Sequence, residues 1–437
     1  MAQVSKLTID SSKIAADLTD FPVYVDLSDM NAEFWATVAN GGGDIRVFKS
    51  DGTTELPREV VSCDTGTETG ELHFKYTGTL SSSSDTEIQI HADGVSSDYA
   101  TTDTYGAENV WNSNYKAVYH LKDANDSTSN GNDGTVSGAT SGAIGKIGEA
   151  YDFDGSNDKI DLGEIDSFNT PNTQTELTIS AWIKADSTSG QGHITRYGAS
   201  VWVWIFRINS DALQAYIRES TGDAILASYA YTDITNKNYV VMSYGGDGVN
   251  RLYINGTEVS TATGDGTLYN TPDDNAVIGS SDILDTTTVF NGIIDETRIS
   301  NIGKSADWIT TEYNNQNSPS TFYTATAAML TVNITDTMSL LETTTLPRSL
   351  LFSQTDTIEM TDSASLLKVI FVNIVETIGL SEATSSVRSR VISIIDSLGL
   401  DEIARARKKI RNLSKNIATG ITNRVKNSMI VKNRSKS

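Results

Sequence analysis

Short runs of alternating apolar and polar residues, separated by glycine, asparagine and aspartate, constrain the fold of this chain most strongly. Successive side chains of a strand point to opposite faces, so such runs predict strands with one buried face. Asn255-Gly256 joins two of these runs and is typical of a tight hairpin turn, whose central residues adopt positive φ. With 33 glycines but only 6 prolines in 437 residues, we expect an all-β protein with few helices.

The strand-like runs fall into two groups, which predict two β-sandwich domains. Six runs occupy residues 1–98 and indicate a small sandwich. Ten runs occupy residues 110–325 and indicate a larger sandwich or a jelly roll. A chain of this length agrees with two or three domains at roughly 150 residues each.

A 20-residue repeat follows in residues 326–402. Its core, DTMSLLE at 336–342, recurs as DTIEMTD at 356–362, ETIGLSE at 376–382 and DSLGLDE at 396–402. An even period keeps the same strand face inward in every repeat. One unit cannot bury that face alone, so we expect four β-repeats that form an assembly stem within a homo-oligomer, with a trimer favoured. The alternative is a set of ordinary strands in another globular domain.

Residues 403–437 differ in charge from the rest of the chain. They contain eleven Lys or Arg and no Asp or Glu, whereas the whole chain has a formal net charge of −23. On a helix their apolar residues would share one side, which predicts a basic amphipathic tail. Such a tail can bind an acidic protein surface or a membrane, or assemble with other helices; the alternative is a disordered tail. The acidic body argues against specific binding of nucleic acid.

Cysteine and histidine limit the metal and redox chemistry that can be expected. The single cysteine excludes a disulfide within the chain and a Cys-rich zinc site. The four histidines are His73, His91, His120 and His193. They form no HExxH motif and no closely spaced pair, so the sequence predicts no structural zinc site.

The stretch AYDFDGSNDKIDLG at 150–163 places four aspartates within fourteen residues. An EF-hand loop that begins at Asp152 would need glycine at its sixth position and glutamate at its twelfth, but Asn157 and Gly163 stand there. The stretch therefore favours a structural hairpin of two strands and a turn. A carboxylate site is the alternative, because Asp152 and Asp154 would share one face of a strand.

Five motifs carry a resemblance to laminin-G-like modules of the concanavalin A-like jelly-roll class, and they occur in the family's order. They are AVYHLKDANDSTSNGNDGT, AYDFDGSNDKIDLG, LTISAWIKA, RLYINGTEV and FNGIIDETRIS. The resemblance covers about residues 110–315 and implies a jelly roll with a binding function. Residues 1–98 resemble an uncharacterised β-sandwich family that often precedes such modules, through LTDFPVYV and DIRVFKSDG. The 20-residue repeat resembles repeats of phage and surface-fibre proteins.

The resemblance also implies a calcium site, and calcium is the only cofactor that we expect. Some modules of this class bind calcium at one rim through loop oxygens, and Asp123, Asp126 and Asp154 are the matching candidates here. The alternative is a set of solvated turns.

A row of aromatic residues is the candidate ligand platform. Trp202, Trp204 and Phe206 would lie on one face of a strand, and flat aromatic rings match the C–H face of a pyranose. The alternative is that the row is buried in the core between two sheets.

Enzymatic activity is not expected. Glycosidases of this fold class carry a Glu-x-Asp-x-x-Glu strand motif, whereas this chain has GIIDETR at 292–298. Its two carboxylates, Asp295 and Glu296, are adjacent and would point to opposite faces of a regular strand.

These features together predict a non-enzymatic virion surface protein, such as a tail fibre, a receptor-binding protein or a capsid decoration protein. The N-terminal residues lack the apolar core of a secretion signal, so we expect synthesis in the host cytoplasm and release within a virion. Residues 110–325 would recognise a host glycan or receptor, and residues 326–437 would bind other virion proteins. A cell-surface or matrix adhesin is the alternative, and a polysaccharide-degrading enzyme is a third reading.

Overall fold

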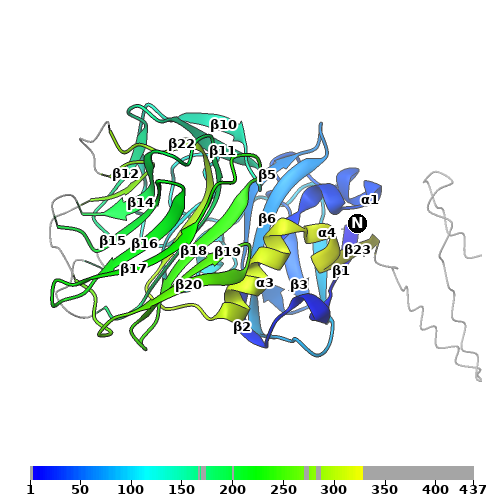
Figure 1. The fold of residues 1–437 in the computed structure, drawn as a ribbon. Coiled ribbons are helices and arrows are strands. Elements are labelled where there is room, and N and C mark those ends of the chain that lie inside the picture. The colour runs from blue at the N-terminus through cyan, green and yellow to red at the C-terminus, as the bar shows by residue number, and fades with distance from the viewer. Residues whose placement is uncertain are drawn as a thin grey trace, which may run out of the picture. The chain divides into compact units, whose positions relative to one another are not determined.

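The computed structural model describes residues 3–327 apart from 166–167, 169–173, 199–200, 270–274 and 282–286. These residues belong to one compact unit that contains two β-sandwiches (Figure 1). The predicted repeats and basic tail lie outside the described residues, except for residues 326–327. None of the helices in the described part is long and apolar enough to cross a membrane.

The first sandwich contains a five-stranded sheet with the order β23-β1-β7-β3-β4 and a three-stranded sheet with the order β2-β6-β5. Its elements are β1 (Gln3–Ile9), β2 (Leu18–Asp26), α1 (Ala32–Trp35), β3 (Arg46–Lys49), β4 (Glu55–Leu56), β5 (Arg58–Asp64), β6 (Thr69–Leu80) and β7 (Thr86–Ala92). All six runs predicted in residues 1–98 are strands. Their inward side chains form one apolar core, which includes Val23, Phe74 and Ile90.

The last described strand, β23 (Tyr323–Ala327), completes the first sandwich. It pairs antiparallel with β1, with Ile9 opposite Tyr323 and Ser5 opposite Ala327. Phe322, the last residue of helix α4 (Pro319–Phe322), is buried in the same core. The predicted domain boundary placed residues up to 325 in the jelly roll. The structure instead returns the chain from residue 319 onwards to the first sandwich, because the N-terminal strand has an edge that β23 covers.

The second sandwich is a jelly roll of an eight-stranded and a seven-stranded sheet. The first has the order β10-β11-β22-β13-β18-β19-β20, with β8 beside β22, and the second has the order β17-β16-β15-β14-β21-β12-β9. Its strands are β8 (Tyr115–Tyr119), β9 (Thr135–Ser137), β10 (Thr140–Ile144), β11 (Glu149–Asp154), β12 (Lys159–Gly163), β13 (Leu177–Ala185), β14 (Gln191–Tyr197), β15 (Trp204–Asn209), β16 (Ala212–Arg218), β17 (Ala224–Ala230), β18 (Asn238–Tyr244), β19 (Val249–Ile254), β20 (Thr257–Thr263), β21 (Ala276–Ile278) and β22 (Asn291–Ser300). This agrees with the all-β fold class expected from the sequence.

The aspartate-rich stretch at 150–163 forms two strands, as expected, but not a hairpin. β11 pairs with β10 and β22, whereas β12 pairs with β21 and β9 in the opposite sheet. The turn between them is closed by its own aspartates, since Asp154 N–H donates to Asp158 at 2.8 Å and Ser156 N–H donates to Asp154 at 2.8 Å. The stretch thus carries the chain from one sheet to the other.

The two sandwiches meet along a polar seam, with helix α3 (Ala306–Asn317) beside it (Figure 1). Asn315 of α3 bonds to both the backbone N–H and the carbonyl of Tyr24 in β2, at 2.7 and 2.9 Å. Glu312 accepts from the Tyr239 hydroxyl of β18 at 2.6 Å. We call the buried charged residues of this contact the seam: they are Glu59, Glu71, His73, His120, Glu296, Arg298 and Glu312.

Candidate functional site

The aromatic row predicted as a ligand platform is mostly core. Trp204 and Phe206 are both 0% exposed, and the Trp204 ring lies 4.9 Å from Tyr197 and 5.3 Å from Phe168, centroid to centroid. These two rings face the opposite sheet and are closed to a ligand. Trp202 differs, because β15 begins only at Trp204 and the alternation does not extend back to it. Its side chain is partly exposed.

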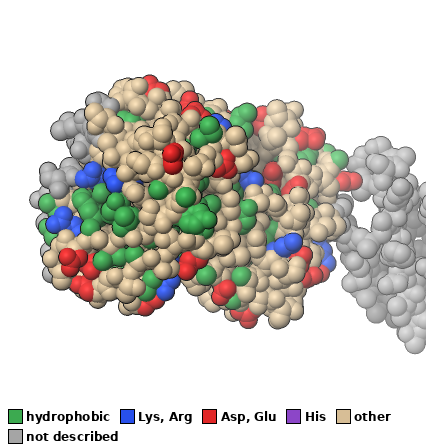
Figure 2. All heavy atoms as spheres, in the orientation of Figure 1, with side chains coloured by type: hydrophobic (Ala, Val, Ile, Leu, Met, Phe, Trp, Pro, Cys, Tyr) green, Lys and Arg blue, Asp and Glu red, His purple; other side chains and the backbone are tan. Residues whose placement is uncertain are grey.

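Trp202 instead joins two tyrosines on the outer side of the seven-stranded sheet. Its ring makes an edge contact with Tyr216 of β16, with centroids 6.0 Å apart. Arg218 lies next to it, with its guanidinium carbon 5.9 Å from the Trp202 ring and 4.9 Å from the Tyr269 ring. All of these side chains are partly exposed. Figure 2 shows hydrophobic side chains beside Lys and Arg over this part of the sheet.

A second arginine, Arg207, packs against Tyr216 in the same group of side chains. The guanidinium of Arg207 lies 5.0 Å from the Tyr216 ring, donates to Gln214 at 2.9 Å and reaches the Tyr216 hydroxyl at 3.3 Å. Strand register explains the grouping, because Arg207 pairs with Gln214 across β15 and β16. We call Trp202, Arg207, Tyr216, Arg218 and Tyr269 the aromatic–arginine surface.

The chemistry of this surface suits a polar ring with an apolar face. Aromatic rings offer flat contact area to C–H groups, and arginines offer several donors in a fixed fork to hydroxyl or carboxylate oxygens. Sequence reasoning missed Tyr216 and Arg218, although the signal was present. In LQAYIRE the apolar residues Leu213, Ala215 and Ile217 are buried, and alternation places Tyr216 and Arg218 on the outer face.

The three aspartates predicted to bind calcium serve as turn acceptors in the structure. Asp126 accepts from Val118 N–H, from Thr128 and from Asn132 N–H, and its burial raises its pKa. Asp123 accepts from Asn125 N–H at 3.0 Å. Within the described residues they are not part of any group of three His, Cys, Asp or Glu side chains with converging donor atoms. A calcium site at this rim stays a prediction.

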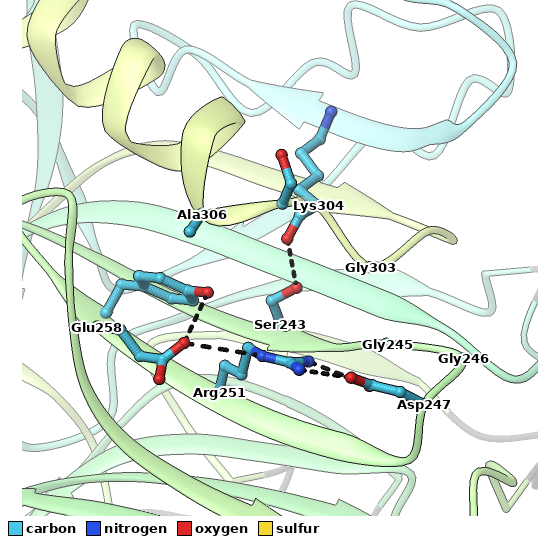
Figure 3. Close-up of a pocket in the computed structure, with 11 residues that line it drawn as sticks. Ser243, Gly245, Gly246, Asp247, Arg251, Glu258, Gly303, Lys304 and Ala306 are labelled. Carbon is cyan, nitrogen blue, oxygen red and sulfur yellow. Dashed lines mark hydrogen bonds and ion pairs between the residues drawn. The ribbon is translucent and has the colours of Figure 1, made fainter. Parts of the chain in front are cut away.

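A shallow pocket of about 350 Å³ lies near the start of α3 (Figure 3). Arg251 spans it, with donors to Asp247 at 3.1 Å and its Nε 3.7 Å from Glu258. The hydrogen bond from Arg251 lowers the pKa of Asp247 to about 2. The Lys304 side chain points away from Arg251 in Figure 3, and its ammonium donates to the Tyr115 hydroxyl at 3.1 Å. The polar groups of this pocket are therefore largely paired with one another.

The adjacent carboxylates Asp295 and Glu296 do not point to opposite faces, in contrast to the sequence-based expectation. β22 bulges at this point, since Trp182 pairs with Asp295 but Ser180 pairs with Arg298, and Glu296 has a φ of 49°. Asp295 accepts from the N–H groups of Lys146 and Ile147, while Glu296 reaches His120. Both carboxylates are 1% exposed, so a polysaccharide cannot reach them.

One family model matches the chain, at residues 154–310. Its description is "Concanavalin A-like lectin/glucanases superfamily" and its name is Laminin_G_3. The jelly roll is thus a concanavalin A-like module, as the sequence motifs indicated. No curated protein matches the chain.

Several solved structures are similar over about half of the chain. Domain 4 of a GH43 extracellular arabinanase from Geobacillus stearothermophilus, in complex with arabinotriose, is 21% identical with a TM-score of 0.33, over 45% of this chain and 96% of that one. The botulinum neurotoxin serotype D ligand binding domain, in complex with N-acetylneuraminic acid, is 16% identical with a TM-score of 0.38, over 48% of this chain. The matched part spans 53% of the neurotoxin domain.

Proposed function

We propose that the protein recognises glycans through the aromatic–arginine surface of its jelly roll. The observation that carries this proposal is the grouping of three partly exposed rings, Trp202, Tyr216 and Tyr269, with two guanidinium groups packed against them. The family match to a superfamily named for lectins and glucanases supports a sugar ligand. The buried position of Asp295 and Glu296 supports binding without hydrolysis.

The preferred ligand is an acidic pyranose, such as a sugar that carries a carboxylate. Arg207 and Arg218 each lie over a tyrosine ring, so their charges are fixed in place before a ligand arrives. A bidentate bond from a guanidinium to a carboxylate adds both strength and orientation. The rings would then hold the apolar side of the same sugar.

Binding of acidic and neutral oligosaccharides to the whole protein, with and without calcium, tests this proposal. Arg218→Gln should weaken binding by about tenfold or more, since a hydrogen bond to a charged group contributes about 1.5–3 kcal/mol. Trp202→Ala should weaken binding to a similar extent, because it removes the largest ring of the surface. Tyr229→Ala is the matched control, because Tyr229 is 46% exposed on the same sheet and pairs with the inward Leu213. Equal affinity of all three variants for every bound sugar would refute the assignment of the site.

We further propose that this recognition serves a virion surface protein with an assembly stem. The repeats of residues 326–402 support this, because their shared apolar face needs a partner. Light scattering of the whole protein beside residues 1–327 tests the proposal. A trimer or larger species that becomes a monomer on truncation supports the stem. A monomeric whole protein that fractionates with cell envelopes instead supports the adhesin alternative.

A further inference from the structure

Two histidines and two glutamates from three separate segments of the sequence meet in the seam. β6 of the first sandwich supplies Glu71 and His73, the segment after β8 supplies His120, and the bulge in β22 supplies Glu296. One donor atom of each side chain lies within 4.8 Å of the donor atoms of the other three. All four side chains are buried, with exposed fractions of 0 to 5%.

From this arrangement we infer that the seam binds a divalent transition-metal ion, with zinc as the best fit. Three distances among the donor atoms approach those of a tetrahedral site. Glu71 Oε1 lies 2.9 Å from His73 Nε2 and 3.2 Å from His120 Nδ1, and His120 Nδ1 lies 2.6 Å from Glu296 Oε1. Metal–ligand bonds of about 2.0–2.1 Å place tetrahedral ligands about 3.3 Å apart. Each of these three contacts would have to lengthen by about 0.7 Å or less to accommodate the ion.

The charges of the seam support a cation. The seam contains four buried carboxylates, those of Glu59, Glu71, Glu296 and Glu312. Its buried basic groups are fewer: the guanidinium of Arg298 and the imidazoles of His73 and His120. Arg298 is shared between Glu296 and Glu312, with 2.6 Å bonds to each. Buried charges are costly unless they are paired or bind a metal. A divalent ion would balance Glu71 and Glu296 and leave both imidazoles neutral.

The surroundings of the histidines also fit a metal site. Ligating histidines characteristically direct their second ring nitrogen at a carboxylate. His120 Nε2 is buried, makes no hydrogen bond and lies 3.3 Å from Glu59, whose carboxylate accepts from Trp111 Nε1 at 2.7 Å. The Nδ1 atom of His73, in contrast, is buried without a hydrogen-bond partner in the described structure, so of the two histidines only His120 shows this feature.

The ligand types indicate which metal would bind, and the burial of the ligands indicates whether the site is structural or catalytic. Two imidazole nitrogens favour zinc or another first-row transition ion over calcium, which takes oxygen ligands. Four protein ligands in a closed environment are typical of a structural site, whereas catalytic zinc keeps an open position. The ion would connect β6 of the first sandwich to β22 of the jelly roll and fix how the two sandwiches dock. Such a site departs from the sequence-based expectation of no structural zinc site.

Metal analysis of the untagged whole protein is the first test. After removal of bound ions with a chelator, the protein should bind one equivalent of zinc and melt several degrees higher when loaded. His73→Gln and Glu71→Gln should abolish both effects. His91→Gln should retain them, because His91 lies in the same sandwich outside the cluster, with Nε2 3.0 Å from Gln89. Absence of stoichiometric zinc in the wild type, or full binding by both ligand variants, would overturn the inference.

Spectroscopy of the wild type keeps the test valid if the ligand variants fail to fold. X-ray absorption at the zinc edge should show two imidazole nitrogens and two oxygens at about 2.0–2.1 Å. The chain has four histidines and residues 403–437 contain no His, Cys, Asp or Glu, so the basic tail cannot produce this signature. A shell of oxygens without imidazole would show a surface ion instead and would overturn the inference.

Discussion

The jelly-roll core and the seam are both buried, but they are built from opposite chemistry. The core consists of aliphatic and aromatic side chains from two sheets, such as Phe153, Phe206 and Ile294. The seam consists of carboxylates, imidazoles and a guanidinium, which lie close to particular partners of opposite charge. Apolar burial is non-directional, whereas a buried charge depends on the position of its partner. The core therefore stabilises the fold, and the seam specifies one way of docking the two sandwiches.

Arg298→Met should have the largest effect, because it breaks the seam at its most shared residue. It would leave Glu296 and Glu312 buried without their common cation, which costs about 4 kcal/mol of unfolding free energy. Urea denaturation measures this loss. A change below about 1 kcal/mol would mean that the seam tolerates unpaired charge and does not specify docking.

Phe206→Ala should cost slightly less, about 3 kcal/mol, through loss of apolar contact and creation of a cavity. Denaturant unfolding is again the measurement, with Phe206→Leu as a milder control. Glycan affinity of the folded fraction should not change, because the ring is closed to ligands. A selective loss of affinity at unchanged stability would restore Phe206 as a ligand residue.

Lys304→Met should remove a pH dependence that the apolar core lacks. Burial lowers the pKa of Lys304 to about 7, below the ordinary value of 10.5. Between these values the unfolded chain binds one more proton than the folded one, so unfolding free energy should rise with pH by about 1 kcal/mol per unit. Comparison of the two proteins at pH 7, 8 and 9 isolates this slope. If the unfolding free energies of the wild type and Lys304→Met changed equally with pH, Lys304 would not be neutral in the folded protein.

Arg251→Met should have the smallest effect, less than about 1 kcal/mol. Its ion pairs with Asp247 and Glu258 are partly exposed to solvent, which screens them (Figure 3). Thermal unfolding beside Arg298→Met makes the contrast direct, since both changes remove an arginine that bridges two acids. Equal losses would show that burial does not distinguish the seam from the surface.

Local pattern accounts for most of what could be predicted. Each strand predicted in residues 1–98 is present, because alternation and turn residues act over a few positions. The missed strands β9 and β10 lie at sheet edges and are largely exposed, so their residues carry little apolar alternation. β14 and β17 were also missed: β14 contains a polar histidine and threonine that are buried, and β17 is an exposed edge strand.

The candidate site was only partly predictable, for a reason that Trp202, Trp204 and Phe206 illustrate. Parity in sequence grouped Trp204 and Phe206 correctly but wrongly included Trp202, because it did not reveal where β15 begins. It also did not reveal which sheet face is inside. Tyr216 and Arg218 follow from alternation once the inward face of β16 is known. Tyr269 lies outside any strand, so only the tertiary structure places it beside Arg218.

The sequence by itself determined the β class, the two sandwiches and the concanavalin A-like motifs, because these rest on short-range periodicity and turn chemistry. The tertiary structure decided the return of β23 to the first sandwich, the crossing of residues 150–163 between sheets and the bulge that turns Glu296 toward His120. It also decided the seam, which brings together residues as far apart in the sequence as Glu59 and Glu312. Pairing over such distances depends on how whole sheets pack, which no local pattern encodes.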